Sequence, residues 1–203
     1  PAPVRRSYNQ TARAEAAAET HRAILQAFIN RLKTGWFEEI TLDAVAADAG
    51  VTVQTVVRRF GGKQGLMEAV GLWISEEVHR NRSVDVVTPA SIAAAIAKDY
   101  EDHGDLVMRF LDQEGRHAAL KPFCDGGRRE HRAWLARYFA PWLEGADSAT
   151  RTARLDALVA ATDLYLWKLL RRDLGRSIKA YRNTVERLIH GALSDVPHPG
   201  SLS

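Results

Sequence analysis

The sequence has little cysteine: a single one, Cys124, occurs among its 203 residues. One thiol excludes an intramolecular disulfide and a zinc site built from several cysteines. No histidine can be placed beside it from the sequence, so a small buried side chain next to Phe123 is favoured over a catalytic thiol. The residue types therefore predict no metal site and no thiol chemistry.

Long hydrophobic runs are also missing. A membrane-spanning helix needs about 18 apolar residues or more, and the most apolar stretch, residues 92–97, is short and mostly alanine. The first six residues contain two arginines, but no apolar segment follows as it would in a secretory signal. We therefore predict a soluble, cytoplasmic protein that does not bind a membrane.

Charge of one sign is not in large excess. The net charge is +3 and the isoelectric point is about 9.2, which permits nucleic-acid binding without requiring it. Hydrophobic residues make up 46% and charged residues 26%, values typical of globular proteins, so a disordered chain is excluded. Function therefore has to be sought in local motifs.

Alternation of apolar and polar residues, the pattern of a half-buried strand, is absent, whereas apolar residues recur at helical spacing almost throughout. The pattern predicts an all-α fold of about nine helices. They are expected at residues 10–33, 42–49, 53–60, 63–78, 89–104, 105–117, 121–145, 148–173 and 177–192. Gly126 and Gly127 could interrupt the seventh, and a mobile N-terminal arm is expected before the first.

Two of these helices are short and are joined by the turn 49–52. Gly50 allows a left-handed turn, Val51 can fill the wedge between the helices, and Thr52 can cap the second helix. Thr41 can cap the first in the same way. Such a pair indicates a helix-turn-helix, although glycine-broken helix pairs occur in many helical proteins.

A longer string makes the interpretation specific. Residues 35–70, GWFEEITLDAVAADAGVTVQTVVRRFGGKQGLMEAV, resemble the DNA-binding domain of the TetR family of bacterial transcriptional regulators. The matching positions are Ile24, Leu25, Ala27, Phe28, Gly35 and the aromatic after it, Thr41, Val45, Ala46, Ala49, Gly50, Val51, Thr55, Phe60, Lys63 and Leu66. The remaining three quarters of the chain is similar to the family only in length and helical character.

The resemblance implies that residues 53–60 form the recognition helix. The residues predicted to lie at DNA are Thr41, Thr52, Val53, Gln54, Thr55, Val57, Arg58, Arg59 and Lys63. Val53, Gln54 and Val57 take family positions that face bases, whereas Thr41, Thr55, Arg58 and Lys63 take positions at or near phosphates. Gln54 is the candidate for direct readout, because its amide can form a bidentate pair with adenine.

The sequence departs from the family at Val57, where a tyrosine is usual. A hydroxyl contact to the DNA backbone is thereby lost, but valine can still touch a thymine methyl group. Altered specificity is therefore expected rather than lost binding. Arg5, Arg6 and Arg13 are candidates for phosphate or minor-groove contact, with an ordinary solvated terminus as the alternative.

The resemblance divides the chain into a DNA-binding domain at 1–62, completed by the first turns of the next helix, a ligand-binding and dimerisation domain at 63–196, and a tail at 197–203. One helix-turn-helix reads few base pairs, so a homodimer on an inverted-repeat operator in double-stranded DNA is expected. The candidates for the dimer interface are Leu158, Thr162, Tyr165, Val185, Leu188 and Ile189. Internal packing of both helix faces is the alternative.

Large aromatic residues mixed with a few polar ones, in the middle of the chain, suit a mostly apolar ligand pocket or an ordinary core. The ligand candidates are Trp73, Tyr100, Phe110, Glu114, His117, Trp134, Tyr138, Trp142 and Trp167. Asp163 lies within an apolar run, where it could pair with Lys168 or Arg137, or contact a ligand or partner.

These observations predict a dimeric, sequence-specific transcriptional regulator, most simply a repressor released by a small apolar or amphipathic inducer. A regulator without a small-molecule ligand is the alternative. An enzyme built on a helical bundle is a third class, but the sequence has no metal-ligand spacing, phosphate-binding loop or nucleophile elbow. We therefore predict no catalytic residues, no metal and no cofactor.

Overall fold

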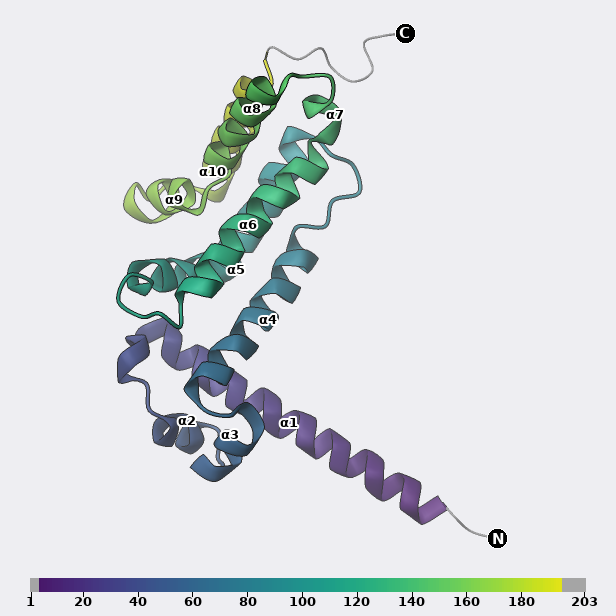
Figure 1. The fold of residues 1–203 in the computed structure, drawn as a ribbon, viewed down its shortest axis with the longest axis vertical. Helices are drawn as coiled ribbons and strands as arrows, with labels where there is room; N and C mark the ends of the chain where they lie inside the picture. The colour runs from purple at the N-terminus through teal and green to yellow at the C-terminus, as the bar shows by residue number, and fades with distance from the viewer. Residues whose placement is uncertain (1–3, 195–203) are drawn as a thin grey trace. The chain divides into compact units, whose positions relative to one another are not determined.

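A computed structural model describes residues 4–194 of the chain, and every regular element in that range is helical (Figure 1). The helices are α1 (Val4–Thr34), α2 (Leu42–Asp48), α3 (Val53–Phe60), α4 (Lys63–Asn81), α5 (Pro89–Gln113), α6 (Lys121–Tyr138), α7 (Ala140–Leu143), α8 (Ser148–Ala161), α9 (Leu164–Trp167) and α10 (Ile178–Ala192). A 3₁₀ turn, η1 (Phe37–Glu39), precedes α2, and a π-helical turn, η2 (Lys168–Asp173), follows α9. The predicted all-α fold is confirmed.

The chain forms two compact units. Unit 1 contains the chain up to Trp73 together with Arg109–Lys121, and unit 2 contains Ile74–Met108 and the chain from Pro122 onward. The helix-turn-helix lies entirely in unit 1. The predicted tail at 197–203 lies outside the described residues.

Unit 1 is built around the C-terminal half of α1. Its apolar residues recur three or four positions apart, so they form one stripe along the helix. Ile24, Phe28 and Leu32 on that stripe are completely or almost completely buried, together with Val45 of α2 and Val56 of α3. The core thus fixes α2 and α3 against α1.

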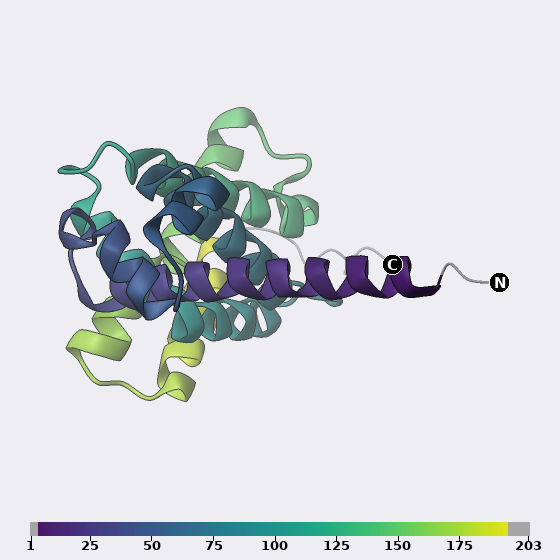
Figure 2. The ribbon, with the colours of Figure 1, turned by 90° about the horizontal axis from the view of Figure 1, so that it is seen from below.

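Helix α1 begins at Val4, so the predicted helix start near residue 10 is wrong. Its N-terminal part extends beyond α2 and α3 in both views (Figures 1 and 2). Arg13 is exposed on this part of the helix. An alanine-rich run, residues 16–18, explains the extension, because alanine has the highest helix propensity.

In unit 2 the predicted helix end at Gly104 is wrong, since α5 continues to Gln113. A Cβ atom on Gly104 would lie 2.6 Å from the ring of Trp167, which is completely buried. Glycine at this position therefore permits a close helix contact rather than ending a helix. Gly126 and Gly127 likewise lie inside an unbroken helix, and α6 ends at Tyr138 rather than near residue 145.

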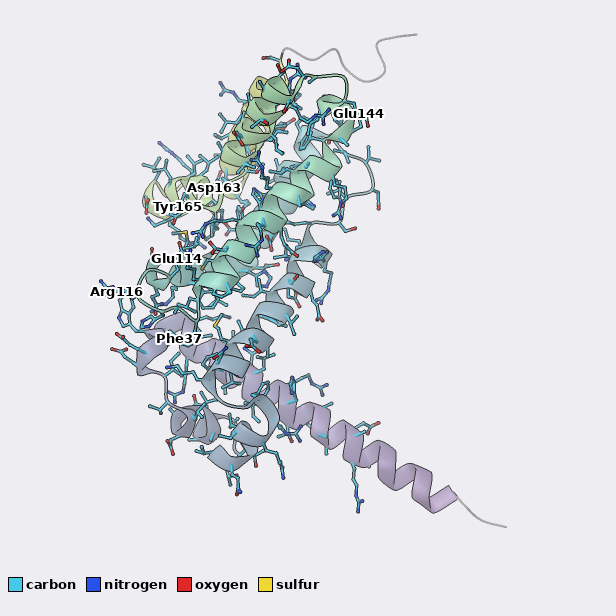
Figure 3. All side chains as sticks on the ribbon, viewed as in Figure 1. Phe37, Glu114, Arg116, Glu144, Asp163 and Tyr165 are labelled. Atoms are coloured by element: carbon cyan, nitrogen blue, oxygen red, sulfur yellow. The ribbon has the colours of Figure 1, made fainter. Side chains whose placement is uncertain are left out.

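The helix predicted at 148–173 is interrupted, which is a second correction. Helix α8 ends at Ala161, and Asp163 has extended backbone angles. Its carboxylate accepts a hydrogen bond from the Tyr165 backbone N–H at 2.8 Å, so it caps α9 (Figure 3). Lys168 pairs with Asp173 instead, at 2.9 Å. Within residues 4–194 no helix is both long enough and apolar enough to cross a membrane.

Candidate nucleic-acid interface

The turn between α2 and α3 has the geometry that its residues predict. Gly50 adopts a left-handed conformation with φ of 65°. The Val51 backbone N–H donates to the Ala46 carbonyl at 2.9 Å, which closes the end of α2. Thr52 and Thr41 cap α3 and α2 by accepting backbone hydrogen bonds, each at 3.2 Å. The predicted caps and the glycine turn are confirmed.

An ion pair that the sequence analysis missed fixes α2 on α1. The guanidinium of Arg31 donates two hydrogen bonds to the carboxylate of Asp48, at 2.6 and 2.9 Å. Bidentate geometry constrains both distance and angle. Opposite charges 17 residues apart give no local sequence signal, so only the fold identifies this pair.

Helix α3 presents a surface that suits DNA. Val56 is completely buried, whereas Gln54, Val57 and Arg58 are exposed, Val57 at 43%. Val53, Thr55 and Arg59 are half-buried at the edges of this surface. The helix contains no acidic residue and ends with two arginines. Short and cationic side chains can therefore approach base edges and phosphates.

The hydroxyl groups of the capping threonines can still donate hydrogen bonds. The exposed hydroxyl of Thr41 accepts from the Ala44 backbone N–H, which leaves its own O–H free for a phosphate oxygen. The hydroxyl oxygens of Thr52 and Thr55 lie 3.0 Å apart, so one donates to the other and one O–H remains. A helix N-terminus between such groups favours an anion.

Lys63, at the first position of α4, is anchored rather than free. Its ammonium donates to the Glu38 carbonyl oxygen at 3.2 Å and lies 4.4 Å from the centre of the Phe37 ring. Burial lowers the pKa of Lys63, and the nearby Glu38 carboxylate partly opposes that shift. Two of the three N–H donors remain for a phosphate.

Arg59 differs from Arg58 although both end α3. The Nε atom of Arg59 is buried without a hydrogen-bond partner, while Arg58 is exposed. Helix α1 contributes a ring contact beside them, because His21 stacks on Phe60 with centroids 4.5 Å apart. Arg58 is therefore the better placed of the two for a phosphate. The side chains of Arg5 and Arg6 lie outside the described residues.

The residues predicted for a ligand do not form one group within either unit. Trp73, Phe110, Glu114 and His117 belong to unit 1, and Tyr100, Trp134, Tyr138, Trp142 and Trp167 belong to unit 2. Within unit 2, Trp134 packs on Tyr138 with centroids 5.1 Å apart, and Tyr100 packs on Trp167 at 6.1 Å. Trp142 contacts Phe139 at 5.5 Å.

A buried ion pair lies beside these rings. The sequence analysis did not predict it. The guanidinium of Arg82 and the carboxylate of Asp99 are 2.6 Å apart, and both side chains are almost completely buried. Arg82 also lies over the rings of Tyr100 and Trp134, 5.3 and 5.5 Å from their centres. The sequence feature that could have indicated this pair is Asp99, an acidic residue on the apolar stripe of α5 with Ile92 and Ile96.

The ion pair extends into a hydrogen-bond chain. Arg82 donates to Nδ1 of His131 at 2.8 Å, and since arginine cannot accept, the imidazole is neutral with its proton on Nε2. That N–H donates to the Thr162 hydroxyl at 3.0 Å, and Tyr100 donates to the Thr162 carbonyl at 2.9 Å. Burial and the Arg82 charge lower the pKa of His131 to about 3. These hydrogen bonds thus fix the non-helical residues between α8 and α9.

The predicted dimer residues divide into two sets. Leu158, Thr162, Val185 and Ile189 are completely buried within the protomer, so their side chains can add no area to a dimer interface. Tyr165 and Leu188 are exposed at 55% and 44%. Other exposed apolar residues nearby in sequence are Leu169, Leu174 and Ile178. These five exposed apolar residues lie on α9, η2 and α10 and in the segment that joins η2 to α10.

Unit 2 has a shallow groove between α5 and α10, lined by Ala90 and Ala93 on one side and by residues such as Ile178 and Arg182 on the other. It contains none of the predicted ligand residues. Among the residues that the structure describes, no cluster of histidine, cysteine, aspartate and glutamate could hold a metal ion.

Comparisons with known proteins agree with this geometry. Residues 37–70 match the model of a family described as bacterial regulatory proteins, tetR family. A proposed transcriptional regulator from Pseudomonas aeruginosa PAO1 is similar at 20% identity over 86% of this chain and 90% of that chain, with a TM-score of 0.67. A transcriptional regulator from Rhodococcus sp. Rha1 is similar at 16% identity over 86% and 96%, with a TM-score of 0.66.

A third similar structure is the multidrug binding protein EbrR complexed with imidazole, at 20% identity over 89% of this chain and 91% of that chain, with a TM-score of 0.57. No curated protein sequence matches the chain. At these identities the structures show a shared fold, and the family match covers the helix-turn-helix segment at residues 37–70.

The helix-turn-helix, together with the surface of α3 that has no acidic residue, defines a DNA-binding transcriptional regulator. Its residues 37–70 match the tetR family of bacterial regulatory proteins. The family resemblance seen in the sequence is therefore confirmed.

Proposed function

We propose that the protein is a dimeric repressor that binds an inverted-repeat operator in the cytoplasm and is released by a small apolar or amphipathic ligand. The observation that carries the proposal is the surface of α3, where Gln54, Val57 and Arg58 are exposed above a completely buried Val56. We assign no catalytic step to the chain, in keeping with its family.

Direct readout is assigned to Gln54 and backbone contact to Lys63. Gln54 is exposed in the first turn of α3, where recognition helices meet base edges. Lys63 has two N–H donors besides the one that bonds to the Glu38 carbonyl oxygen. The two residues should therefore affect DNA binding in different ways.

We expect Gln54→Ala to relax sequence preference at one base pair, costing about 1–3 kcal/mol on the cognate site. Lys63→Ala should weaken all sequences alike and reduce the salt slope by about one. The measurement is selection from a random duplex pool followed by titration against salt. Equal losses on cognate and random DNA for Gln54→Ala would contradict direct readout, and recovery of no inverted repeat would contradict the operator proposal.

Dimer formation is supported by the apolar surface on α9, η2 and α10. Tyr165, Leu169, Leu174 and Leu188 are all more than 40% exposed. Exposed apolar side chains of this size favour burial against a partner, because their contact with water is unfavourable. A second copy of the chain is the occupant that an inverted-repeat operator requires.

We expect Leu188→Arg to convert the protein to monomers, because a charge would be buried at the interface without a partner. Sedimentation should give the unmodified protein at twice the 22.6 kDa chain mass. The matched control is Leu72→Arg on α4, where the side chain is 70% exposed and outside this surface. Monomers before substitution, or loss of dimers with the Leu72 variant, would contradict the assignment.

Ligand binding is supported by the interior of unit 2. The Tyr181 hydroxyl is completely buried and has no hydrogen-bond partner, a state that costs about 1–3 kcal/mol. Burial raises the pKa of Tyr181, so the phenol is neutral and available as a donor. A ligand with an acceptor oxygen or nitrogen would satisfy it. EbrR, which has the same fold, is a multidrug binding protein.

A thermal-shift screen with apolar and amphipathic compounds tests this part of the proposal. A compound at about 100 times its dissociation constant should stabilise the protein by about 2.7 kcal/mol. The same compound should weaken operator binding, whereas a Tyr181→Phe variant should respond less. No shift with any compound would favour a regulator whose helical domain serves dimerisation alone.

A further inference from the structure

Two residues far in sequence from the recognition helix hold the segment between α1 and η1. They lie in the last turn of α5, at Arg109 and Gln113, and we name them the α5 clamp. Gln113 is buried with 1% exposure, and its side-chain oxygen accepts a hydrogen bond from the Phe37 backbone N–H at 2.8 Å. The same side chain donates to the Arg109 carbonyl at 2.8 Å, which fixes its orientation.

Arg109 completes the clamp from the other side. Its guanidinium donates to the carbonyl oxygens of Leu32 and Gly35, at 3.2 and 2.9 Å. These carbonyls lie at the C-terminal end of α1, where helix acceptors lack partners within the helix. The clamp therefore fixes both the end of α1 and the start of η1.

The η1 turn in turn fixes Lys63. Phe37 lies between the Lys63 ammonium, 4.4 Å from the ring centre, and the His117 ring at 5.7 Å. The carbonyl of Glu38 accepts from the same ammonium at 3.2 Å. Figure 3 labels Phe37 and also Arg116, whose guanidinium lies over Trp36 at 5.8 Å. A continuous series of contacts thus joins Gln113 to Lys63 through the η1 backbone.

We propose that Gln113 and Arg109 are positioning residues for DNA binding, which act by holding the η1 turn so that the Lys63 ammonium meets a phosphate. Both residues lie outside the segment 37–70 that matches the family model. The inference rests on DNA binding by the α3 surface. It adds that the affinity depends on the end of α5, although no side chain there is assigned a DNA contact.

The test is a double-mutant cycle on the full-length protein with the selected operator duplex, read by fluorescence anisotropy. Gln113→Leu removes both hydrogen bonds at similar volume, and we expect it to weaken binding about tenfold. Lys63→Ala should weaken binding about tenfold as well. The double variant should be no weaker than Lys63→Ala alone, because Gln113 acts through Lys63.

The matched control is Gln26→Leu, an exposed glutamine of α1 that donates to Asn30 at 2.9 Å. It should leave the affinity within about twofold. If Gln113→Leu does not fold, Arg109→Lys replaces it in the cycle, since it removes the forked donor geometry and retains the charge. Operator binding by the unmodified protein, measured in parallel, separates failure of DNA binding from failure of the clamp.

Three results would overturn the proposal. One is an unchanged affinity for both clamp variants. Another is additive losses in the double variant, which would indicate a general structural role rather than positioning of Lys63. The last is an unchanged affinity for Lys63→Ala.

Discussion

Substitution of Gly65 by alanine should weaken specific DNA binding at least about a hundredfold while unit 2 still folds. Gly65 lies in the first turn of α4, and a Cβ atom there would overlap the carbonyl oxygen of Phe60 and lie 2.9 Å from its carbonyl carbon. Phe60 is the last residue of α3, so its backbone has to move. Overpacking of this kind costs about 1–3 kcal/mol or more, and here it displaces the recognition helix.

The measurement combines operator titration with thermal unfolding followed by circular dichroism. We expect an affinity at least about a hundredfold lower for Gly65→Ala, from about 3 kcal/mol of strain. Gly127→Ala in α6 is the matched control, because a Cβ atom there meets nothing within 4 Å. It should leave DNA binding unchanged and increase stability slightly, since alanine favours a helix. Wild-type affinity with Gly65→Ala would show that the close approach is not needed.

Loss of one partner of the buried Arg82–Asp99 pair should give the largest loss of stability. Removing either charge leaves the other uncompensated in the core of unit 2, which costs about 3–5 kcal/mol. Desolvation opposes ionisation of Asp99, but hydrogen bonds from His103 and Arg82 hold its pKa below the ordinary value. The carboxylate is therefore charged at neutral pH, and its contribution to stability is lost as pH falls through that lowered pKa.

Chemical denaturation should show this loss for Asp99→Ala and for Arg82→Met. The double variant Arg82→Met with Asp99→Leu should recover at least half of it, because no unpaired charge then remains. The exposed pair Lys98–Asp102, 2.7 Å apart, is the control. Asp102→Ala should change the free energy of unfolding by less than about 1 kcal/mol. Similar losses for Asp99→Ala and Asp102→Ala would contradict the role of burial.

Two of the corrected helix predictions concern glycines. Gly104 and Gly126 were expected to end or interrupt helices, but each lies within a continuous helix. A glycine costs a helix only about 1 kcal/mol, which tertiary packing readily exceeds. At Gly104 the packing partner is Trp167, whose ring fits only because no Cβ is present. Sequence alone shows the glycine but not the ring.

The sequence by itself determined the helical class and the DNA-binding motif. Each cap and turn in that motif depends on residues within five positions, such as Thr52 with Thr55 and Val51 with Ala46, so local chemistry specifies it. Its exposed residues followed from the same periodicity, because burial of Val56 places Gln54 and Val57 on the surface.

Only the tertiary structure decided how distant polar groups are partnered. Asp163 had several candidate partners in the sequence, and it proves to cap α9 because the chain breaks where Tyr100 donates to the Thr162 carbonyl. Gln113 and Phe37 are 76 residues apart, yet they share a buried hydrogen bond. Pairing over such separations depends on how whole helices pack, and helix periodicity specifies which face is buried but not which residue lies opposite it.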